Sequence, residues 1–135
     1  MNMHISFEGK KKVIADYNGY RIITDQAVSA GGEGSAPAPF DFFVASIGTC
    51  AGIYVKSFCD KRGISTDGIT LDQNMKFDPE THMISHLEIM IHLPGDFPEK
   101  YKSALVNVAN MCAVKRHLLH PPEMTVTIRL NAIEK

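Results

Sequence analysis

The sequence PFDFFVASIGTCAGIYVKSFCDKR, residues 39–62, decides the fold of this chain. Its apolar residues recur at steps of three and four from Phe40 to Arg62, which predicts an α-helix, and Gly63 is a natural C-terminal cap. A second apolar stripe follows the other side of the same helix. Because so little of its surface is polar, we expect this helix to be central and packed on both sides, partly against a second subunit.

Short antiparallel strands are predicted before this helix. Residues 13–17 and 20–24 are joined by Asn18-Gly19, a two-residue turn that suits hairpins. Residues 29–39, SAGGEGSAPAP, are rich in glycine, proline and serine, which predicts a loop. The N-terminal part should therefore form short strands, followed by a loop that leads into the long helix.

Two strands, a second helix and a last strand are predicted after it. Residues 69–77 and 83–93 flank a turn, and the second of these strands should bury the face that carries Leu87, Ile89, Ile91 and Leu93. A helix is expected from about Glu99 to Leu119, before two prolines. The apolar face of a last strand follows: Met124, Val126, Ile128 and Leu130. The order βββ–α–ββ–α–β favours an α+β fold with antiparallel sheet.

The composition fits one domain spanning residues 1–135. Hydrophobic residues make up 44% of the chain and charged residues 21%, as in soluble globular proteins. The formal net charge is −1, and Lys10-Lys11-Lys12 is the only basic run, so we expect no nucleic-acid partner. No stretch approaches the ~20 apolar residues of a membrane span, and the N-terminus lacks a signal-peptide pattern. The sequence therefore predicts a cytoplasmic protein without membrane contact.

Cysteines offer the most specific chemistry in this chain. Cys50 lies in the first predicted helix and Cys112 in the second, 62 residues later. A thiol can attack a peroxide, and a second thiol can take the oxidised sulfur into a disulfide. Buried cysteines without any reactivity are also common. Cys59 follows Cys50 by nine residues, which is the opposite side of a helix, so we expect Cys59 to be either a core residue or partly exposed filler.

A reactive cysteine needs a nearby positive charge or a helix N-terminus to become a thiolate. Cys50 lies nearly three turns into its predicted helix, so the cation must come from elsewhere. The residues alone leave four arginines open: Arg21, Arg62, Arg116 and Arg129. The six histidines show no metal-ligand spacing, so we expect them at the surface and expect no metal or other cofactor.

Two motifs link the chain to a known family. One is Gly31-Gly32-Glu33-Gly34 followed by PAPFDFFVASIGTC, residues 37–50; the other is CAVKRHL, residues 112–118. Both resemble the OsmC-like family, which includes the organic hydroperoxide resistance proteins, and the element order resembles it over nearly the whole chain. The resemblance implies an intertwined homodimer with two long central helices and thiol sites at the subunit interface.

The resemblance also implies the roles of the two cysteines. Cys50 would attack a small apolar hydroperoxide and become a sulfenic acid, Cys112 would resolve it as a disulfide, and a dithiol would then reduce that disulfide. In the hydroperoxide resistance branch, a glutamate ten residues before the first cysteine pairs with the activating arginine. Here Phe40 occupies that position, and Asp41 is acidic one residue later. Arg21, on an early strand, is the first candidate for the arginine, with Asp41 orienting it.

Two other functions fit the same residues. A non-enzymatic stress protein of this fold would hold a small apolar ligand in its interface cavity, and its cysteines would be core residues. A thiol sensor would form the Cys50–Cys112 disulfide to change the binding of a partner, without catalytic turnover. Consumption of peroxide by the native protein separates the three.

Overall fold

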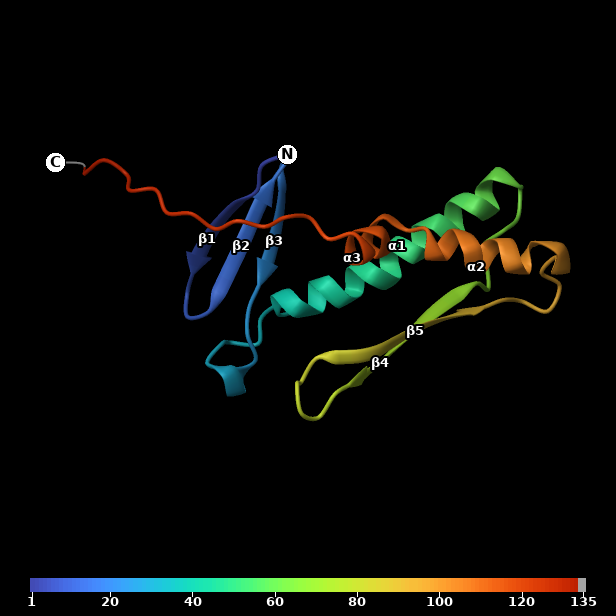
Figure 1. Cartoon of the computed structure of the whole chain (residues 1–135), viewed down its shortest axis with the longest axis horizontal. Helices are drawn as coiled ribbons and strands as arrows, with labels where there is room; N and C mark the ends of the chain where they lie inside the picture. Colours follow the sequence, from blue (N-terminus) through green and yellow to red (C-terminus); the bar gives the residue numbers. More distant parts are fainter. Residues whose placement is uncertain (134–135) are drawn as a thin grey trace.

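The fold is built on one long central helix, as seen in a computed structural model that describes residues 1–133 (Figure 1). A three-stranded antiparallel sheet lies at the N-terminal end of this helix and a two-stranded hairpin lies along it. The three strands pair in the order β1-β2-β3. Their bounds are His4–Glu8 for β1, Lys12–Tyr17 for β2 and Tyr20–Thr24 for β3. The predicted α+β class is confirmed, with two separate antiparallel sheets.

The predicted long helix is α1, Pro39–Lys61. It begins at a proline, and the Asp41 carboxylate accepts a hydrogen bond of 2.9 Å from the backbone N–H of Ala38, which satisfies one of the free donors at the helix start. It ends at Lys61, and Gly63, whose φ of +65° suits a residue without a Cβ, turns the chain away while Ile64 N–H donates back to the Cys59 carbonyl. Both predicted boundaries are correct to within one or two residues.

A hairpin of β4, Thr70–Phe77, and β5, Ile84–His92, packs one face toward α1. Gln73 pairs with Ile89 in the antiparallel register, so both side chains lie on the same face. Along β5, Leu87, Ile89 and Ile91 are partly buried, whereas His86, Glu88, Met90 and His92 are exposed. The alternation predicted for this strand is therefore confirmed.

The second helix differs from its prediction as one continuous helix from Glu99 to Leu119. It consists of three pieces: η2, Glu99–Tyr101; α2, Lys102–Asn110; and α3, Ala113–Leu119. The break falls at Met111 and Cys112, where Cys112 adopts an extended conformation with φ −61° and ψ 150°. Cys112 Sγ accepts a 3.4 Å hydrogen bond from Lys115 N–H, so the thiol caps the new helix. Apolar periodicity runs through both pieces and does not reveal this restart.

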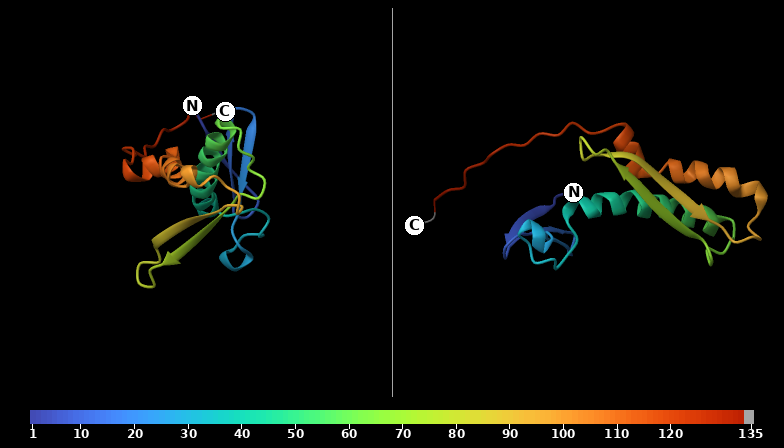
Figure 2. Two further views of the ribbon diagram at one scale, coloured as in Figure 1. Left: turned by 90° about the vertical axis from the view of Figure 1, so that its right-hand side faces the viewer. Right: turned by 90° about the horizontal axis from the view of Figure 1, so that it is seen from below.

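The last predicted strand is not formed within the chain. Residues 120–133 follow α3 as an extended segment without helix or strand, and Figure 2 shows them leaving α3 and running past the N-terminal sheet, separate from it. Four of their apolar side chains are 84–98% exposed: Met124, Val126, Ile128 and Leu130. The alternation suits a strand, but a strand forms only where a neighbouring edge accepts its hydrogen bonds. We call residues 120–133 the C-terminal segment.

The core lies where the second half of α1 meets α2 and η2. It contains Val55, Phe58 and Cys59 from α1 together with Phe97 and Leu105. The Tyr101 ring meets the Phe58 ring edge-on at 5.8 Å. By length and composition α1 could cross a membrane, contrary to the sequence analysis, and only 28% of its most apolar window is buried within the chain. This helix therefore presents a large apolar surface that the rest of the chain leaves uncovered.

Candidate functional site

Cys50 lies in the middle of α1 and is half-buried. Ile47 precedes it by three residues and Tyr54 follows it by four, so these side chains lie on the same side of the helix as the thiol. Ile47 is 9% exposed and Ala51 1% exposed. The thiol therefore lies at the margin of the packed face of α1, where a reactant can reach a sulfur that is sheltered on one side.

Cys112 is buried, with 1% of its surface exposed. It lines a cavity of about 580 Å³ that is bounded by β5, α2 and α3, and Ile47 of α1 lines the same cavity. Most of the wall is apolar, with Leu87, Ile89 and Leu105 among its residues. The second predicted site residue is therefore next to a hollow of the size that small ligands occupy.

The structure brings the turns that carry the two cysteines together. Ile47, one turn before Cys50, shares the cavity with Cys112. Tyr54, one turn after Cys50, accepts a 3.4 Å hydrogen bond through its hydroxyl from Arg116 Nη2, and Arg116 is one turn after Cys112. The first turn of α3 thus lies alongside the turn of α1 that contains Cys50. Both thiols are free in this structure.

The four arginines have different partners. Arg21, on β3, pairs with Glu8 of β1, and the two side chains are about half exposed. Arg62 stacks on the Phe58 ring at 3.6 Å and donates to the Phe58 carbonyl. Arg129 lies in the exposed C-terminal segment. Of the four, Arg116 has the hydrogen bond that reaches the Cys50 region, whereas the role predicted for Arg21 stays a prediction.

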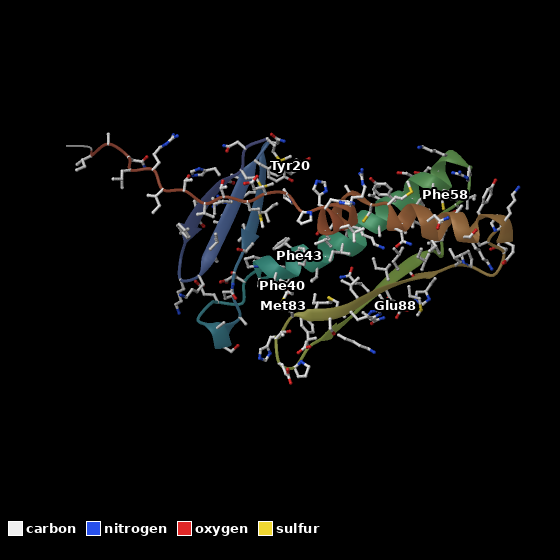
Figure 3. The ribbon with its side chains drawn as sticks, viewed as in Figure 1. Tyr20, Phe40, Phe43, Phe58, Met83 and Glu88 are labelled. Atoms are coloured by element: carbon white, nitrogen blue, oxygen red, sulfur yellow. The ribbon has the colours of Figure 1, made fainter. Side chains whose placement is uncertain are left out.

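Asp41 takes part in the start of α1. Its carboxylate accepts a hydrogen bond from Ala38 N–H, as described above, and the side chain is exposed. Phe40, beside it, packs against Phe43 with ring centroids 5.6 Å apart (Figure 3). Asp41 therefore caps the helix in this structure, and the orientation of an arginine by Asp41 stays a prediction.

Asp25 is a buried carboxylate that the sequence analysis did not identify. It accepts hydrogen bonds from the Ser35 hydroxyl at 2.6 Å and from the backbone N–H groups of Gln26, Glu33 and Ser35. The bonds from Ser35 and then Gln26 lower its pKa from 3.8 to about 2. Asp25 thereby closes the glycine-rich loop that leads into α1. An acidic residue at the end of a strand before a glycine run is the signal that could have found it.

Gly32 shows how tightly this loop is closed. A Cβ at this position would lie 2.0 Å from the Gln26 carbonyl oxygen and 2.8 Å from Asp25 Oδ1. Only glycine fits there. The glycine-rich motif therefore shapes the entrance to α1, through contacts made within the chain itself.

Gln73 is a second residue that the sequence analysis did not identify. Its side-chain amide, on β4, donates a 2.8 Å hydrogen bond to the Val44 carbonyl of α1. A Cβ at Gly48 would lie 2.4 Å from Gln73 Oε1, so this glycine lets the amide approach the helix backbone. The hairpin is therefore docked on α1 two residues before Cys50.

Cys59 belongs to the core, one of the two placements predicted for it. It is fully buried, and desolvation raises the pKa of its thiol, with a further contribution from the Asp60 carboxylate. A buried thiol with a raised pKa is a poor nucleophile. Among residues 1–133, no group of three histidine, cysteine or acidic side chains is arranged to hold a metal ion.

Comparisons with known proteins identify the family and the fold. The model of the OsmC family, described as OsmC-like protein, matches residues 32–127. No curated protein sequence matches the chain. A crystal structure from Psychrobacter arcticus 273-4, of a protein ascribed to the osmotic stress and detoxification response, is similar with a TM-score of 0.72 and 21% identity, over 86% of each chain.

A second similar structure is that of an organic hydroperoxide resistance protein OsmC from Legionella pneumophila, also described as a predicted redox protein and regulator of sulfide bond formation. It has a TM-score of 0.53 and 16% identity, over 87% of this chain and 89% of that chain. At such identities the two likenesses show the fold.

Proposed function

The chain belongs to the OsmC-like family, and on that premise we propose that it is a thiol-dependent peroxidase that reduces organic hydroperoxides. The observation that carries the proposal is the placement of the first turn of α3, with Cys112, alongside the turn of α1 that contains Cys50. The two thiols are 62 residues apart in sequence, yet residues within one turn of each of them meet through this hydrogen bond and this cavity wall. Such a placement is what a two-cysteine peroxidase requires.

In the first step, the Cys50 thiolate attacks the outer oxygen of the hydroperoxide. The O–O bond breaks, Cys50 becomes a sulfenic acid, and the remaining alkoxide takes up a proton and leaves as an alcohol. The half-buried position of Cys50 leaves its sulfur accessible to such a substrate. Apolar surroundings favour an alkyl or aryl hydroperoxide over hydrogen peroxide, because only the former gains by leaving water.

In the second step, the Cys112 sulfur attacks the Cys50 sulfur. The S–O bond breaks, a Cys50–Cys112 disulfide forms, and the oxygen leaves as water. A dithiol reductant then restores both thiols by exchange and is itself oxidised to a disulfide. Each cycle converts one hydroperoxide and one dithiol into one alcohol, one water and one disulfide. The cycle as proposed uses no metal or organic cofactor.

The proposal includes a homodimer in the cytoplasm. Apolar side chains of α1 and of the C-terminal segment are exposed in the single chain, among them Phe40, Ile53 and Val126. A continuous apolar surface of this kind on a soluble protein indicates an interface, and a second copy of the same chain fits it by symmetry. A reducing compartment keeps the three cysteines free between cycles.

Thiol counting under stopped flow tests this function. Reduced native protein is mixed with cumene hydroperoxide, and free thiols are counted before and after the reaction. We expect the loss of two thiols per chain, with peptide mapping that assigns them to Cys50 and Cys112. If no thiol is lost, and all three titrate only after unfolding, the peroxidase proposal is wrong.

One observation favours a second candidate, a binding protein. The cavity beside Cys112 is largely apolar and has room for a small ligand, and Cys112 is buried in its wall. A protein of this kind would bind an apolar probe such as 1,8-anilinonaphthalene sulfonate without consuming peroxide. Binding that persists in Cys50→Ser, together with unreactive thiols in the native chain, would support this candidate.

A further inference from the structure

We infer that Tyr54 and Arg116 form a latch that holds the first turn of α3 against α1 and so keeps Cys112 in reach of Cys50. This inference rests on the proposed Cys50–Cys112 disulfide and adds two positioning residues to it. The latch is the 3.4 Å hydrogen bond from Arg116 Nη2 to the Tyr54 hydroxyl. Neither residue touches the reacting atoms in this proposal, because both act through the helices that carry the thiols.

The spacing of the latch matches the spacing of the thiols. Tyr54 follows Cys50 by four residues, and Arg116 follows Cys112 by four. Within α1 this spacing puts Tyr54 and Cys50 on the same face of the helix. Arg116 lies one turn above the cap residue Cys112, because Arg116 N–H donates a 3.0 Å hydrogen bond to the Cys112 carbonyl. A bond between the two latch residues therefore turns the side of α1 with Cys50 toward the first turn of α3, which Cys112 caps.

The short helix α3 needs such an anchor. It has seven residues, none of them buried, and it is bounded by the break at Met111 and Cys112 on one side and by the C-terminal segment on the other. A helix of this length is unstable without tertiary contacts. Among the side-chain hydrogen bonds of residues 1–133, the latch is the one that joins α3 to α1.

Arg116 is also available for this role. No ion pair within the described part of the chain involves its guanidinium, in contrast to Arg21, which pairs with Glu8. Its neighbour Lys115 has its ammonium on Asn110, at the end of α2. The two basic residues therefore anchor α3 to different elements. Lys115 spans the break between α2 and α3, whereas Arg116 connects α3 to α1.

The step that depends on the latch is disulfide closure. Cys112 must give up the hydrogen bond from Lys115 N–H and leave its buried position before its sulfur can bond to that of Cys50. The cap at the start of α3 is released as this happens. Arg116, one turn after Cys112, keeps the first turn of α3 against α1, which raises the effective concentration of one sulfur at the other.

The test measures how readily the disulfide forms when no peroxide is present. Reduced protein is equilibrated in glutathione buffers of different GSH to GSSG ratio, alkylated, and mapped by mass spectrometry for the Cys50–Cys112 disulfide. For Tyr54→Phe and Arg116→Met we expect the equilibrium constant for closure to fall about three- to tenfold, the range that one lost hydrogen bond produces. Arg116→Lys, which keeps a donor and a charge, should restore part of the loss.

A control variant and a double-mutant cycle show whether a loss of closure comes from this hydrogen bond or from a general effect of the substitutions. Tyr20→Phe removes a hydroxyl from an exposed tyrosine of β3 and should leave closure within about twofold of the parent chain, the scatter of exposed sites. In a double-mutant cycle, Tyr54→Phe with Arg116→Met should cost no more than either change alone. Single variants that close as readily as the parent, fully additive losses, or a parent chain that never forms this disulfide would each overturn the latch.

The peroxide reaction is measured separately on the same variants. Tyr54→Phe should lengthen the lifetime of the Cys50 sulfenic acid, detected by dimedone trapping, by the same factor by which closure falls. If the parent chain forms the disulfide in glutathione but consumes no hydroperoxide, the latch stands and the peroxidase proposal fails. If it consumes hydroperoxide and the variants trap no more sulfenic acid than the parent, the latch fails and the peroxidase proposal stands.

Discussion

The two ends of α1 have very different surroundings. At the C-terminal end, Phe58 is buried and lies against Tyr101, whereas at the N-terminal end Phe40 and Phe43 are 50% and 41% exposed (Figure 3). Both ends carry aromatic and aliphatic side chains in sequence. The difference lies in what the rest of the chain provides, because α2 and η2 cover one end and no element of the described chain covers the other to the same extent.

This comparison teaches that the chain completes only part of its core by itself. The start of α1 has apolar side chains that no other element of the described chain fully covers. The C-terminal segment carries alternating apolar residues that are exposed in the single chain. An exposed apolar helix face and an exposed segment with alternating apolar residues can each bury the other in an interface. Cys50 lies between the covered and the uncovered end, which is where an interface site would place it.

The largest expected effect concerns Cys50, which lies between the covered and the uncovered end of α1. Cys50→Ser should abolish hydroperoxide consumption, because an alcohol at this position is not a nucleophile for peroxide oxygen at neutral pH. Cys112→Ser should still react once per chain, and its Cys50 should then oxidise further to sulfinic acid. Mass spectrometry of the intact chain should show no added oxygen in Cys50→Ser and two added oxygens in Cys112→Ser after excess hydroperoxide. Full turnover in Cys50→Ser would contradict the assignment.

The next effect concerns the uncovered end and the C-terminal segment. Val126→Asp with Ile128→Asp should convert the proposed dimer into a monomer, since two fully buried aliphatic side chains contribute about 3 to 6 kcal/mol per chain. Light scattering over a range of protein concentrations measures the change. The matched control is Thr125→Asp with Thr127→Asp, which puts the same charges on the alternate face of the segment. Equal behaviour of the two double variants would argue against a strand that buries one face.

The sequence predicts the elements whose partners are close along the chain. The hairpin turns, the long helix and the alternation of β5 are all confirmed, because each is decided by local turn chemistry or by the burial of one face. The last strand is not formed, because Met124 to Leu130 needs an edge that no local pattern can supply. The break before Cys112 also escaped prediction, since α2 and α3 continue the same apolar stripe across it.

The candidate site was predictable to a similar extent. Cys50 and Cys112 could be picked from their motifs, and the structure places their turns side by side. Gln73 was missed because it acts through a hydrogen bond to a backbone carbonyl of another segment, which carries no sequence signal, whereas Asp25 had only the weak signal of an acidic residue before a glycine run. The hydrogen bond that connects Arg116 to Tyr54 spans 62 residues and needed the three-dimensional arrangement, whereas the arginine that activates Cys50 stays a prediction.

A smaller effect distinguishes the two ends of α1 by how the loss of unfolding free energy in a variant depends on protein concentration. Phe58→Ala should lower the free energy of unfolding by about 3 to 5 kcal/mol at every concentration, since its surroundings belong to the same chain. Phe43→Ala should cost less, and its cost should grow with concentration as the dimer forms. Urea unfolding at two well-separated concentrations measures both. The same concentration dependence for both variants would remove the distinction between a self-covered and a partner-covered end.

The smallest effect concerns the loop that leads into the uncovered end. The folded chain lowers the pKa of Asp25 from 3.8 to about 2, so the carboxylate stabilises the fold wherever it is ionised in both states, above about pH 4. This contribution should disappear as the pH falls from about 4 toward 2, because the unfolded chain then takes up a proton that the folded chain resists. Asp25→Asn should therefore lower the melting temperature at pH 7 and flatten its fall below pH 4.

Thermal unfolding at several pH values compares this variant with Asp67→Asn, which changes an exposed carboxylate that accepts no side-chain hydrogen bond within residues 1–133. The comparison matters for the uncovered end, because Asp25 N–H also donates to the Pro37 carbonyl just before α1. If the loop directs α1 toward its partner, Asp25→Asn should weaken the proposed dimer as well as the chain. An acid profile that matches that of Asp67→Asn would mean that the loop keeps its shape without the buried charge.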